Sequence, residues 1–341
     1  MTLSKIAPKV TLGLFVVAVS ASAVAPVSTA TVSHEPRNIK PSHGARSIKS
    51  AQEARSIKFT SKRLKGGLIE CASENPGLAA FLTRDIAKSL KNRASKASVV
   101  LYDRTTHTSC TYGADKHYDS ASIVKPMILG ALLLDRGVHL SKEKQDLARQ
   151  MIVSSDNDAT YTLWDIVGPK NIQNFLDKAG MKNTVLDEAG FMGLTQVTAR
   201  DQAKLLELLT AKDSSVLNAE ERSYILGLMR DVQKDQRWGT PAAAPSDAAV
   251  QVKNGWLQRS ETGLKNPWDR GDWKVNSMSA ITGRAYDYGL VVLTENNRVP
   301  EGESPEVGWD YGMDTVEGVA KAIHHDLYPD HTPPATGNPS L

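Results

Sequence analysis

The spacing of apolar and polar positions predicts helices in the middle of the chain and strands toward both ends. Helical periodicity covers the ranges 76–94, 122–137, 141–154, 160–167, 170–179, 198–211, 219–232 and 315–327. Strand patterns cover the ranges 97–103, 108–113, 248–258, 273–282 and 286–295. This order predicts an α/β (α+β) fold, in which a five-stranded antiparallel sheet is closed by both chain ends and flanked by helices. An all-helical subdomain, about residues 122–245, is inserted in its middle.

The first residues have the pattern of a secretory signal. Lys5 and Lys9 precede a short apolar run that ends in small residues, which predicts a signal peptide within residues 1–30, cleaved after Ala23 or Ala30. No cysteine follows either site, so we expect no lipoprotein anchor. A signal anchor that stays in the membrane is the alternative. The prediction is a secreted, extracellular protein that can associate with the cell wall.

A basic segment follows the signal. Residues 31–66 contain nine Lys and Arg but only two Glu, and the sequence Ala-Arg-Ser-Ile-Lys occurs twice, at 45–49 and 54–58. Few large apolar side chains occur here, so residues 31–70 are expected to be a disordered tether, as is the Pro-rich tail 329–341. The tether could contact an anionic cell-wall polymer electrostatically or be a solvated linker without a partner. Nothing in the sequence favours nucleic-acid binding.

The chain contains two cysteines, Cys71 and Cys110. In an oxidising compartment they could form one disulfide that closes a loop of about 40 residues, and two separate buried thiols are the alternative. His324, His325 and His331 lie near the C-terminal end, where a solvated cluster is expected rather than a metal site. We therefore expect no metal and no cofactor, and a monomer.

Ser122 and Lys125 are candidates for a nucleophile and its general base. They lie three positions apart on one expected helix, so their side chains share a face. A lysine acts as a base only when it is deprotonated, and the apolar stretch 127–134 provides the burial that lowers a lysine pKa. The alternative is a helix-capping serine and a surface lysine.

Two further tripeptides change that interpretation. Ser155-Asp156-Asn157 could simply cap the next helix, and Lys253-Asn254-Gly255 could place an exposed lysine on an edge strand. The three motifs in this order resemble the S-x-x-K, S-D-N and K-[T/S]-G signatures of the penicilloyl-serine transferase superfamily, within it the class A β-lactamase and DD-peptidase branch. The similarity covers about residues 76–327. It implies that the motifs line one cleft between the sheet and the helical subdomain.

The resemblance implies catalytic roles for four side chains. Ser122 would be the acylated nucleophile and Lys125 its base. Ser155 would pass a proton to the leaving nitrogen. Lys253 would orient Ser155 and attract a substrate carboxylate through its positive charge.

The resemblance also implies substrate contacts. Asn157 would bind the substrate amide and help to hold Lys125. The N–H groups of Ser122 and Trp256 would form an oxyanion hole, and Gly255 would keep the strand edge open for the substrate. Asn254, which stands where the family has Thr or Ser, would offer an amide to the substrate carboxylate.

Two departures from the family concern the walls of the cleft. Ser155 follows Ser122 after only 33 positions, which implies a more open site. The loop that carries a deacylating glutamate in class A enzymes is short here. Glu188 is the possible deacylation base and Asp187 its neighbour, with a solvated loop carboxylate as the favoured alternative for both. Slow deacylation is therefore expected.

The predicted function is an exported active-site serine hydrolase that is acylated by an amide or lactam, either a β-lactam or a D-alanyl peptide. The substrate would be a small molecule or derived from peptidoglycan. The alternative is a non-catalytic cell-wall-binding or regulatory protein that retains the fold. The intact nucleophile and base favour the enzyme, because a binding module has no need of them.

Overall fold

A computed structural model describes residues 57–260, 271–299 and 302–330. The predicted signal peptide, the first part of the predicted tether and residues 331–341 lie outside these ranges. Among the described residues, no helix is both long and apolar enough to cross a membrane.

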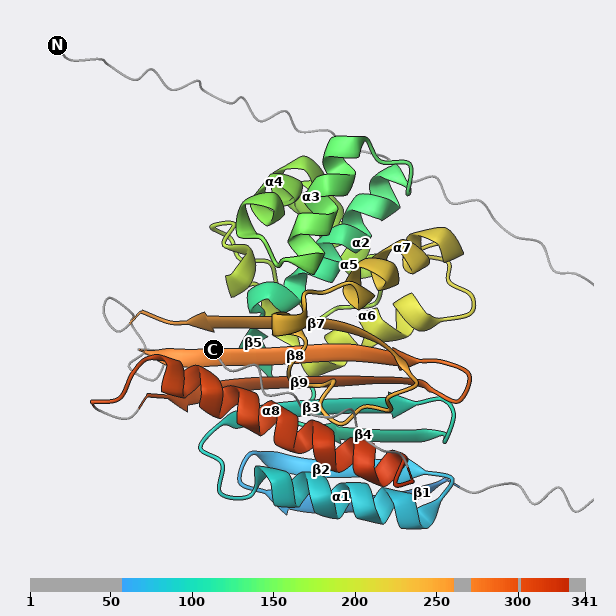
Figure 1. The fold of residues 1–341 in the computed structure, drawn as a ribbon, viewed down its shortest axis with the longest axis vertical. Helices are drawn as coiled ribbons and strands as arrows, with labels where there is room; N and C mark the ends of the chain where they lie inside the picture. Colours follow the sequence, from blue (N-terminus) through green and yellow to red (C-terminus); the bar gives the residue numbers. More distant parts are fainter. Residues whose placement is uncertain (1–56, 261–270, 300–301, 331–341) are drawn as a thin grey trace, which may run out of the picture. The chain divides into compact units, whose positions relative to one another are not determined.

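One antiparallel sheet of seven strands forms the centre of the domain, in the order β1-β2-β4-β3-β9-β8-β7 (Figure 1). The strands are β1 (Lys58–Leu64), β2 (Gly67–Ser73), β3 (Lys96–Asp103), β4 (Thr108–Tyr112), β7 (Ala249–Gln258), β8 (Asp272–Thr282) and β9 (Asp287–Arg298). The five predicted strands are contiguous from β4 to β7, which confirms the predicted fold class. The predicted number of strands is wrong, because β1 and β2 extend the sheet at one edge.

The hairpin of β1 and β2 corrects the prediction that the whole range 31–70 is a disordered tether. Ile69, Cys71 and Ser73 are buried at alternate positions of β2, as in a strand with one covered face. In β1 the hydroxyl of Thr60 donates to the carbonyl of Ala79. The basic side chains of β1 are mostly exposed, which is common on an edge strand and explains why composition alone indicated disorder.

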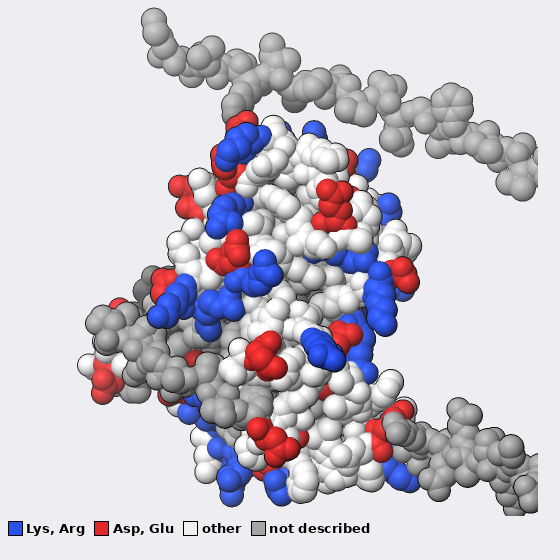
Figure 2. All heavy atoms as spheres, turned by 45° about the vertical axis from the view of Figure 1, so that its right-hand side comes forward, with Lys and Arg blue, Asp and Glu red and all other residues white. Residues whose placement is uncertain are grey.

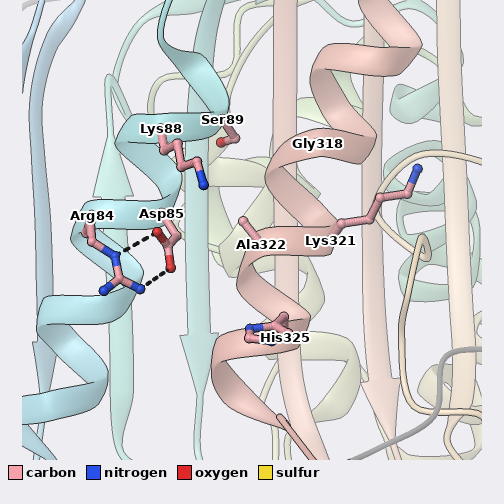
Figure 3. Close-up of a pocket in the computed structure, with 8 residues that line it drawn as sticks. All are labelled: Arg84, Asp85, Lys88, Ser89, Gly318, Lys321, Ala322 and His325. Carbon is pink, nitrogen blue, oxygen red and sulfur yellow. Dashed lines mark hydrogen bonds and ion pairs between the residues drawn. The ribbon is translucent and has the colours of Figure 1, made fainter.

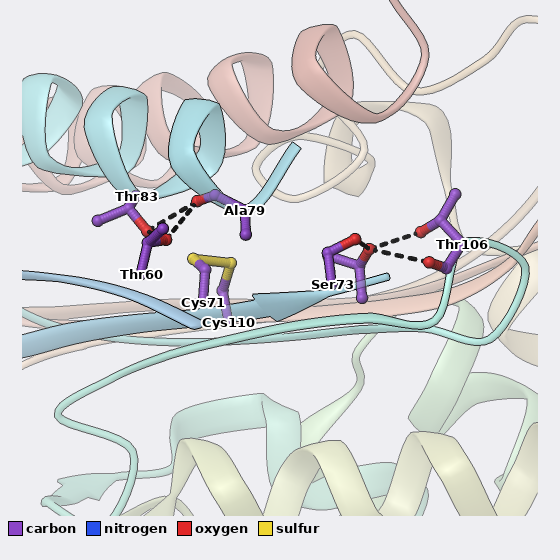
Figure 4. Close-up of a disulfide and its surroundings, with 8 residues drawn as sticks. Thr60, Cys71, Ser73, Ala79, Thr83, Thr106 and Cys110 are labelled. Carbon is purple, nitrogen blue, oxygen red and sulfur yellow. Dashed lines mark hydrogen bonds between the residues drawn. A yellow bond between two sulfur atoms is a disulfide. The ribbon is translucent and has the colours of Figure 1, made fainter. Parts of the chain in front are cut away.

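Cys71 and Cys110 form a disulfide between β2 and β4 (Figure 4). The two residues are direct partners in the strand pairing, and each is 1% exposed. A hydrogen bond between the hydroxyls of Ser73 and Thr108 joins the same two strands. Loop-closure entropy for a separation of 39 residues corresponds to about 4 kcal/mol of stability. The disulfide therefore fastens the hairpin to the rest of the sheet.

Helices α1 (Pro76–Leu90) and α8 (Glu306–Leu327) pack together across one face of the sheet (Figure 1). The predicted last helix starts at 315, nine residues later than α8 does. The reason is that Gly308 and Gly312 interrupt the apolar pattern. A Cβ at either position would lie within 2.5 Å of Trp273 or Val275, so the two glycines allow α8 to approach the sheet.

The helical subdomain lies between β5 (His117–Asp119) and β7 in the sequence. Its helices are α2 (Lys125–Arg136), α3 (Lys142–Val153), α4 (Asn157–Val167), α5 (Pro169–Lys178), α6 (Ala199–Thr210) and α7 (Ala219–Arg230). Short 3-10 helices are η1 (Ala121–Val124), η2 (Met192–Leu194) and η3 (Lys234–Gln236), and β6 (Gln196–Thr198) pairs with β5. Every residue of α2 from Lys125 to Leu133 is buried, so α2 is the central helix of this subdomain.

The surface of the domain carries both signs of charge. On the face shown in Figure 2, Lys and Arg side chains are interspersed with Asp and Glu. Neither sign forms a continuous surface on this face. We therefore expect the charge of any binding site on this protein to be determined by the individual residues that line it.

Candidate active site

Ser122 lies on η1, directly before the buried helix α2. Ser120, two residues before Ser122, is tied to the loop that includes η2, because its amide donates to Thr195 O (2.9 Å) and its hydroxyl donates to Met192 O (3.1 Å). Ala121 has a φ of 46°, a left-handed conformation that costs energy in a residue other than glycine. Ser122 itself is only partly buried. Ser122 therefore lies on a strained turn that hydrogen bonds attach to the η2 loop.

Lys125 is fully buried at the start of α2. Its Nζ donates to Ser155 O (2.5 Å), to Ser155 Oγ (3.1 Å) and to Asn157 Oδ1 (2.9 Å). Burial lowers the pKa of Lys125 to about 8, and the negative charge of Asp156 acts in the opposite direction. A substantial fraction of this amine is therefore neutral near pH 8, as a general base requires.

Ser155 lies between α3 and α4 in a left-handed conformation, with a φ of 57°. Its Oγ accepts from Lys125 Nζ and, on the other side, from Lys253 Nζ at 2.9 Å. The neighbouring Asp156 caps α4 by accepting from the amide of Ala159. With two ammonium donors on its oxygen, the Ser155 hydroxyl proton is left to donate elsewhere.

Lys253 comes from β7 and is fully buried. Besides Ser155, its Nζ donates to Asn254 O (3.0 Å), and no carboxylate of the described residues pairs with it. Burial, and then the nearby positive charge of Lys125, lower the pKa of Lys253 well below its ordinary value. The two amines thus form a positively charged pair from which loss of one proton is favoured.

Gly255 brings the edge of β7 against the turn that carries Ser122. A Cβ at position 255 would lie 2.5 Å from the Ser122 nitrogen and 2.7 Å from the Ile123 nitrogen, so no other residue fits without displacing one segment. Trp256 follows directly on β7. The Ser122 and Trp256 amides, the predicted oxyanion-hole donors, therefore come from two segments in direct contact.

The prediction for Asn254 is wrong, because its side chain is buried and its amide nitrogen already donates to the protein. It is fully buried, and its Nδ2 donates to Gln236 O (3.0 Å) and Trp238 O (2.8 Å). Side chains alternate along a strand, so the face that directs Lys253 and position 255 toward Ser122 turns Asn254 to the other side. Asn254 holds the segment 236–238 rather than contacting a substrate carboxylate.

The segment 233–238 belongs to the site and was not indicated by any motif. Gln233 Nε2 donates to Ser154 Oγ and Gln236 Nε2 donates to Ser154 O, both at 3.2 Å. Together with the Asn254 contacts, this segment joins the Ser155 region to β7. Two glutamines in a polar stretch give no sequence signal that would have identified them.

Three tryptophans gather at the end of this segment. Trp238, Trp256 and Trp309 have ring centroids 5.8 to 6.1 Å apart, and each side chain is partly exposed. They come from the segment 233–238, β7 and the first turns of α8. The aromatic contacts therefore hold β7, just beyond Gly255, against two other elements.

Glu188 makes no hydrogen bond or ion pair with Ser122 or Lys125. It is exposed and has no hydrogen bond or ion pair to the described residues. Two backbone hydrogen bonds between Val185 and Gln196 (2.9 and 2.8 Å) join the two ends of the loop that carries Glu188. Asp187 has a structural contact, since it accepts from the amides of Ala189 and Phe191. Glu188 lines a cavity of about 330 Å³ that also includes Arg259.

A larger groove of about 770 Å³ lies between α1 and α8 (Figure 3). It is lined by Arg84, Asp85, Lys88, Ser89, Gly318, Lys321, Ala322 and His325. Arg84 and Asp85 pair with one another, and none of the predicted site residues lines this groove. Within the described part of the chain, no three His, Cys, Asp or Glu side chains are arranged to hold a metal ion.

Sequence and structure comparisons identify the family. A model described as the beta-lactamase enzyme family matches residues 134–304, a range that begins after Ser122 and Lys125 and includes Ser155 and Lys253. No curated protein matches the sequence significantly.

Solved class A beta-lactamases share the fold. One from Bacteroides cellulosilyticus is 14% identical, with 74% of this chain and 99% of that chain covered and a TM-score of 0.58. The TLA-1 extended-spectrum beta-lactamase is 16% identical, with 73% and 98% covered and a TM-score of 0.58. A variant of the last common ancestor of Gram-negative class A beta-lactamases is 19% identical, with 74% and 100% covered and a TM-score of 0.56. With half of its length matched by the family model, the chain belongs to the beta-lactamase enzyme family, and it shares the fold of solved class A beta-lactamases.

Proposed function

We propose that this protein is an exported active-site serine hydrolase that is acylated on Ser122 by an amide or lactam, either a β-lactam or a D-alanyl peptide. The observation that carries the proposal is the convergence of Lys125 and Lys253 on the hydroxyl of Ser155. Burying two lysines beside one serine costs stability, and a purely structural role does not explain that cost. A catalytic role explains it, because neutral Lys125 can accept a proton and Ser155 can pass one on.

In the proposed acylation step, neutral Lys125 accepts the proton of Ser122, and the Ser122 oxygen attacks the substrate carbonyl carbon. The negative charge that develops on the carbonyl oxygen is stabilised by the N–H groups of Ser122 and Trp256. When the carbon–nitrogen bond breaks, Ser155 donates its proton to the leaving nitrogen. Ser155 recovers a proton from Lys125, so the proton of Ser122 is transferred to the leaving group.

Charge determines which substrates would be preferred. The pair of Lys125 and Lys253 is positively charged as long as one of its amines is protonated, which favours substrates that carry a carboxylate near the scissile bond. Asn157 is exposed and its oxygen already accepts from Lys125, so its amide nitrogen is available for a substrate carbonyl. Because the Asn254 side chain is turned away, binding of a substrate carboxylate would depend on the two lysines rather than on Asn254.

Deacylation is proposed to be slow. Hydrolysis of the acyl-enzyme needs a base that activates water, and Glu188, the predicted candidate, is exposed and has no hydrogen bond to the described residues. An adduct on Ser122 should therefore persist. This favours a penicillin-binding type of reaction over efficient β-lactam hydrolysis.

The test is to incubate the mature protein with a chromogenic cephalosporin and a fluorescent penicillin while turnover and intact mass are followed. Ser122→Ala is the control. A long-lived adduct that Ser122→Ala lacks supports the proposal. Rapid turnover would contradict slow deacylation and point to Glu188 as the base. Absence of any adduct would contradict acylation and favour the non-catalytic wall-binding alternative.

Export is part of the proposal. The disulfide of Cys71 and Cys110 supports it, because such bonds persist mainly in oxidising compartments. The basic tether is proposed to contact anionic cell-wall polymer. N-terminal sequencing of the protein from culture medium and from cell walls tests the cleavage site and the location together.

A further inference from the structure

An ion pair lies directly beside the candidate nucleophile turn. Arg259 immediately follows β7, and Asp119 is the last residue of β5, three positions before Ser122. The guanidinium donates twice to the carboxylate, with Nε to Oδ2 at 2.6 Å and Nη2 to Oδ1 at 2.8 Å. The Asp119 side chain is 4% exposed and that of Arg259 is 22% exposed, so solvent screens this pair only partly.

The ion pair is one part of a set of contacts around the turn. Gln196 Nε2 donates to Asp119 Oδ1 at 2.6 Å. Asn276 Nδ2, from β8, donates to the carbonyls of Asp119 (2.9 Å) and Ser120 (3.3 Å). The amide of Arg259 donates to Asp272 O at 2.8 Å, which fastens the arginine to the sheet. The residues that lead into Ser122 are thus held from β6, from β8 and from the end of β7.

Other charges near Asp119 already have partners. Lys274 is buried on β8 and pairs with Asp272 (2.7 Å) and Glu295 (3.1 Å). Burial acts to lower the pKa of Lys274, but Asp272, then Glu295 and then Asp119 raise it above its ordinary value. Arg259 is therefore the cation in direct contact with the Asp119 carboxylate among the described residues. Removing it would leave a buried carboxylate without its ion-pair partner, three residues from the nucleophile.

The position of the pair matters because the predicted oxyanion hole takes one N–H from each of two segments. Close contact between these segments is evident at Gly255, where a Cβ would meet the Ser122 nitrogen at 2.5 Å. Arg259 is four residues further along the chain from Gly255, and Asp119 is three residues before Ser122. The ion pair therefore connects the same two segments that must stay in register for both donors to reach one oxygen.

We propose that Arg259 and Asp119 are positioning residues for acylation, which hold the end of β7 against the Ser122 turn. The proposal rests on the proposed function and adds a specific requirement to it. Misplacement of a reacting group by about 1 Å can cost about 100-fold in rate. Loss of the pair should consequently slow acylation and change initial substrate binding little.

The first experiment measures the acylation rate constant and the dissociation constant of the non-covalent complex separately, by stopped-flow with a fluorescent penicillin. Arg259→Ala is expected to lower the rate constant about 10- to 100-fold while the dissociation constant changes less than about threefold. Arg259→Lys keeps the charge but loses the two-pronged geometry, so it should recover part of the rate. The combined Asp119→Asn and Arg259→Ala variant should lose no more than the worse single variant.

The matched control is the ion pair of Arg200 and Asp115, which has the same two-pronged geometry (2.6 and 3.0 Å) but is far more exposed, at 43% and 62%. Arg200→Ala should acylate within about twofold of wild type. The proposal is overturned if Arg259→Ala acylates at the wild-type rate, if Arg200→Ala is equally impaired, or if the Asp119 and Arg259 losses multiply.

A second experiment does not depend on activity. Hydrogen–deuterium exchange of peptides covering residues 118–124 should become faster in Arg259→Ala and remain unchanged in Arg200→Ala. If wild type is not acylated by any β-lactam, the proposed function fails, while this exchange result still decides whether the pair holds the turn. Unchanged exchange in Arg259→Ala would overturn the positioning role itself.

Discussion

Replacing Lys125 by methionine should remove a pH-dependent loss of stability that burial of the lysine causes in the wild type. The pKa of Lys125 is about 8 in the folded protein and about 10.5 when unfolded. Protonation therefore favours the unfolded state as the pH falls from above 10.5 through 8, and the penalty is complete below 8. Linkage between these two values gives a penalty of about 3 kcal/mol at pH 7 and about 1 kcal/mol at pH 10.

Methionine has no such penalty, but it also loses the three hydrogen bonds of Lys125, a cost that does not depend on pH in this way. The decisive quantity is thus the change in the stability difference between two pH values. Relative to Lys125→Met, wild type should gain about 2 kcal/mol in unfolding free energy between pH 7 and pH 10.

The assay is urea-induced unfolding of both proteins at pH 7 and pH 10, followed by tryptophan fluorescence. Lys182→Met, which removes an exposed lysine, is the control and should show a change near zero. A stability difference between wild type and Lys125→Met that is the same at both pH values would refute the reasoning. It would mean that the lysine is solvated or paired well enough to stay charged.

Three further outcomes are expected. The acylation rate of wild type should rise with pH to a plateau with a midpoint near 8, since only neutral Lys125 acts as a base, and a pH-rate profile measured by mass spectrometry checks this. Gly255→Ala should lower the acylation rate at least about 100-fold, because its Cβ would lie 2.5 Å from the Ser122 nitrogen. The control is Gly227→Ala, whose Cβ would have no atom within 4 Å. It should acylate at the wild-type rate and be about 0.5 to 1 kcal/mol more stable. Replacing Cys71 and Cys110 by serine should lower the free energy of unfolding by about 4 kcal/mol in a denaturant titration and leave acylation at low temperature unchanged. Loss of acylation together with stability would indicate that the hairpin also supports the candidate site.

Much of the fold follows from local patterns in the sequence. The five strands from β4 to β7 combine β-branched residues with turn residues at their ends, and the helices between them carry clear apolar stripes. The hairpin is different, because the exposed lysines and arginines of β1 have the composition of a disordered segment. Its order depends on pairing with β2 and on the distant Cys110, which no local pattern encodes.

The candidate site was predictable to the extent that spacing determines geometry. Ser122 and Lys125 share a turn, and the sequence motifs indicate Ser155 and Lys253 even though these residues come from separate elements. The orientation of Asn254 was not predictable, because it depends on which face of β7 meets the helical subdomain. The contacts of segment 233–238 likewise depend on tertiary packing.

The order of strands also determines where the domain is attached to whatever precedes it in the chain. β1 is one edge of the sheet and β7, which carries Lys253 and Gly255, is the opposite edge. Six strand spacings of about 4.8 Å separate them, or about 29 Å. A pulling force applied through the N-terminal side would reach β1 and the disulfide first, and the four strand pairings from β4 to β7 would separate that load from Lys253 and Gly255. Under such a load, the hairpin of β1 and β2 would bear force before the strand that carries Lys253 and Gly255 does.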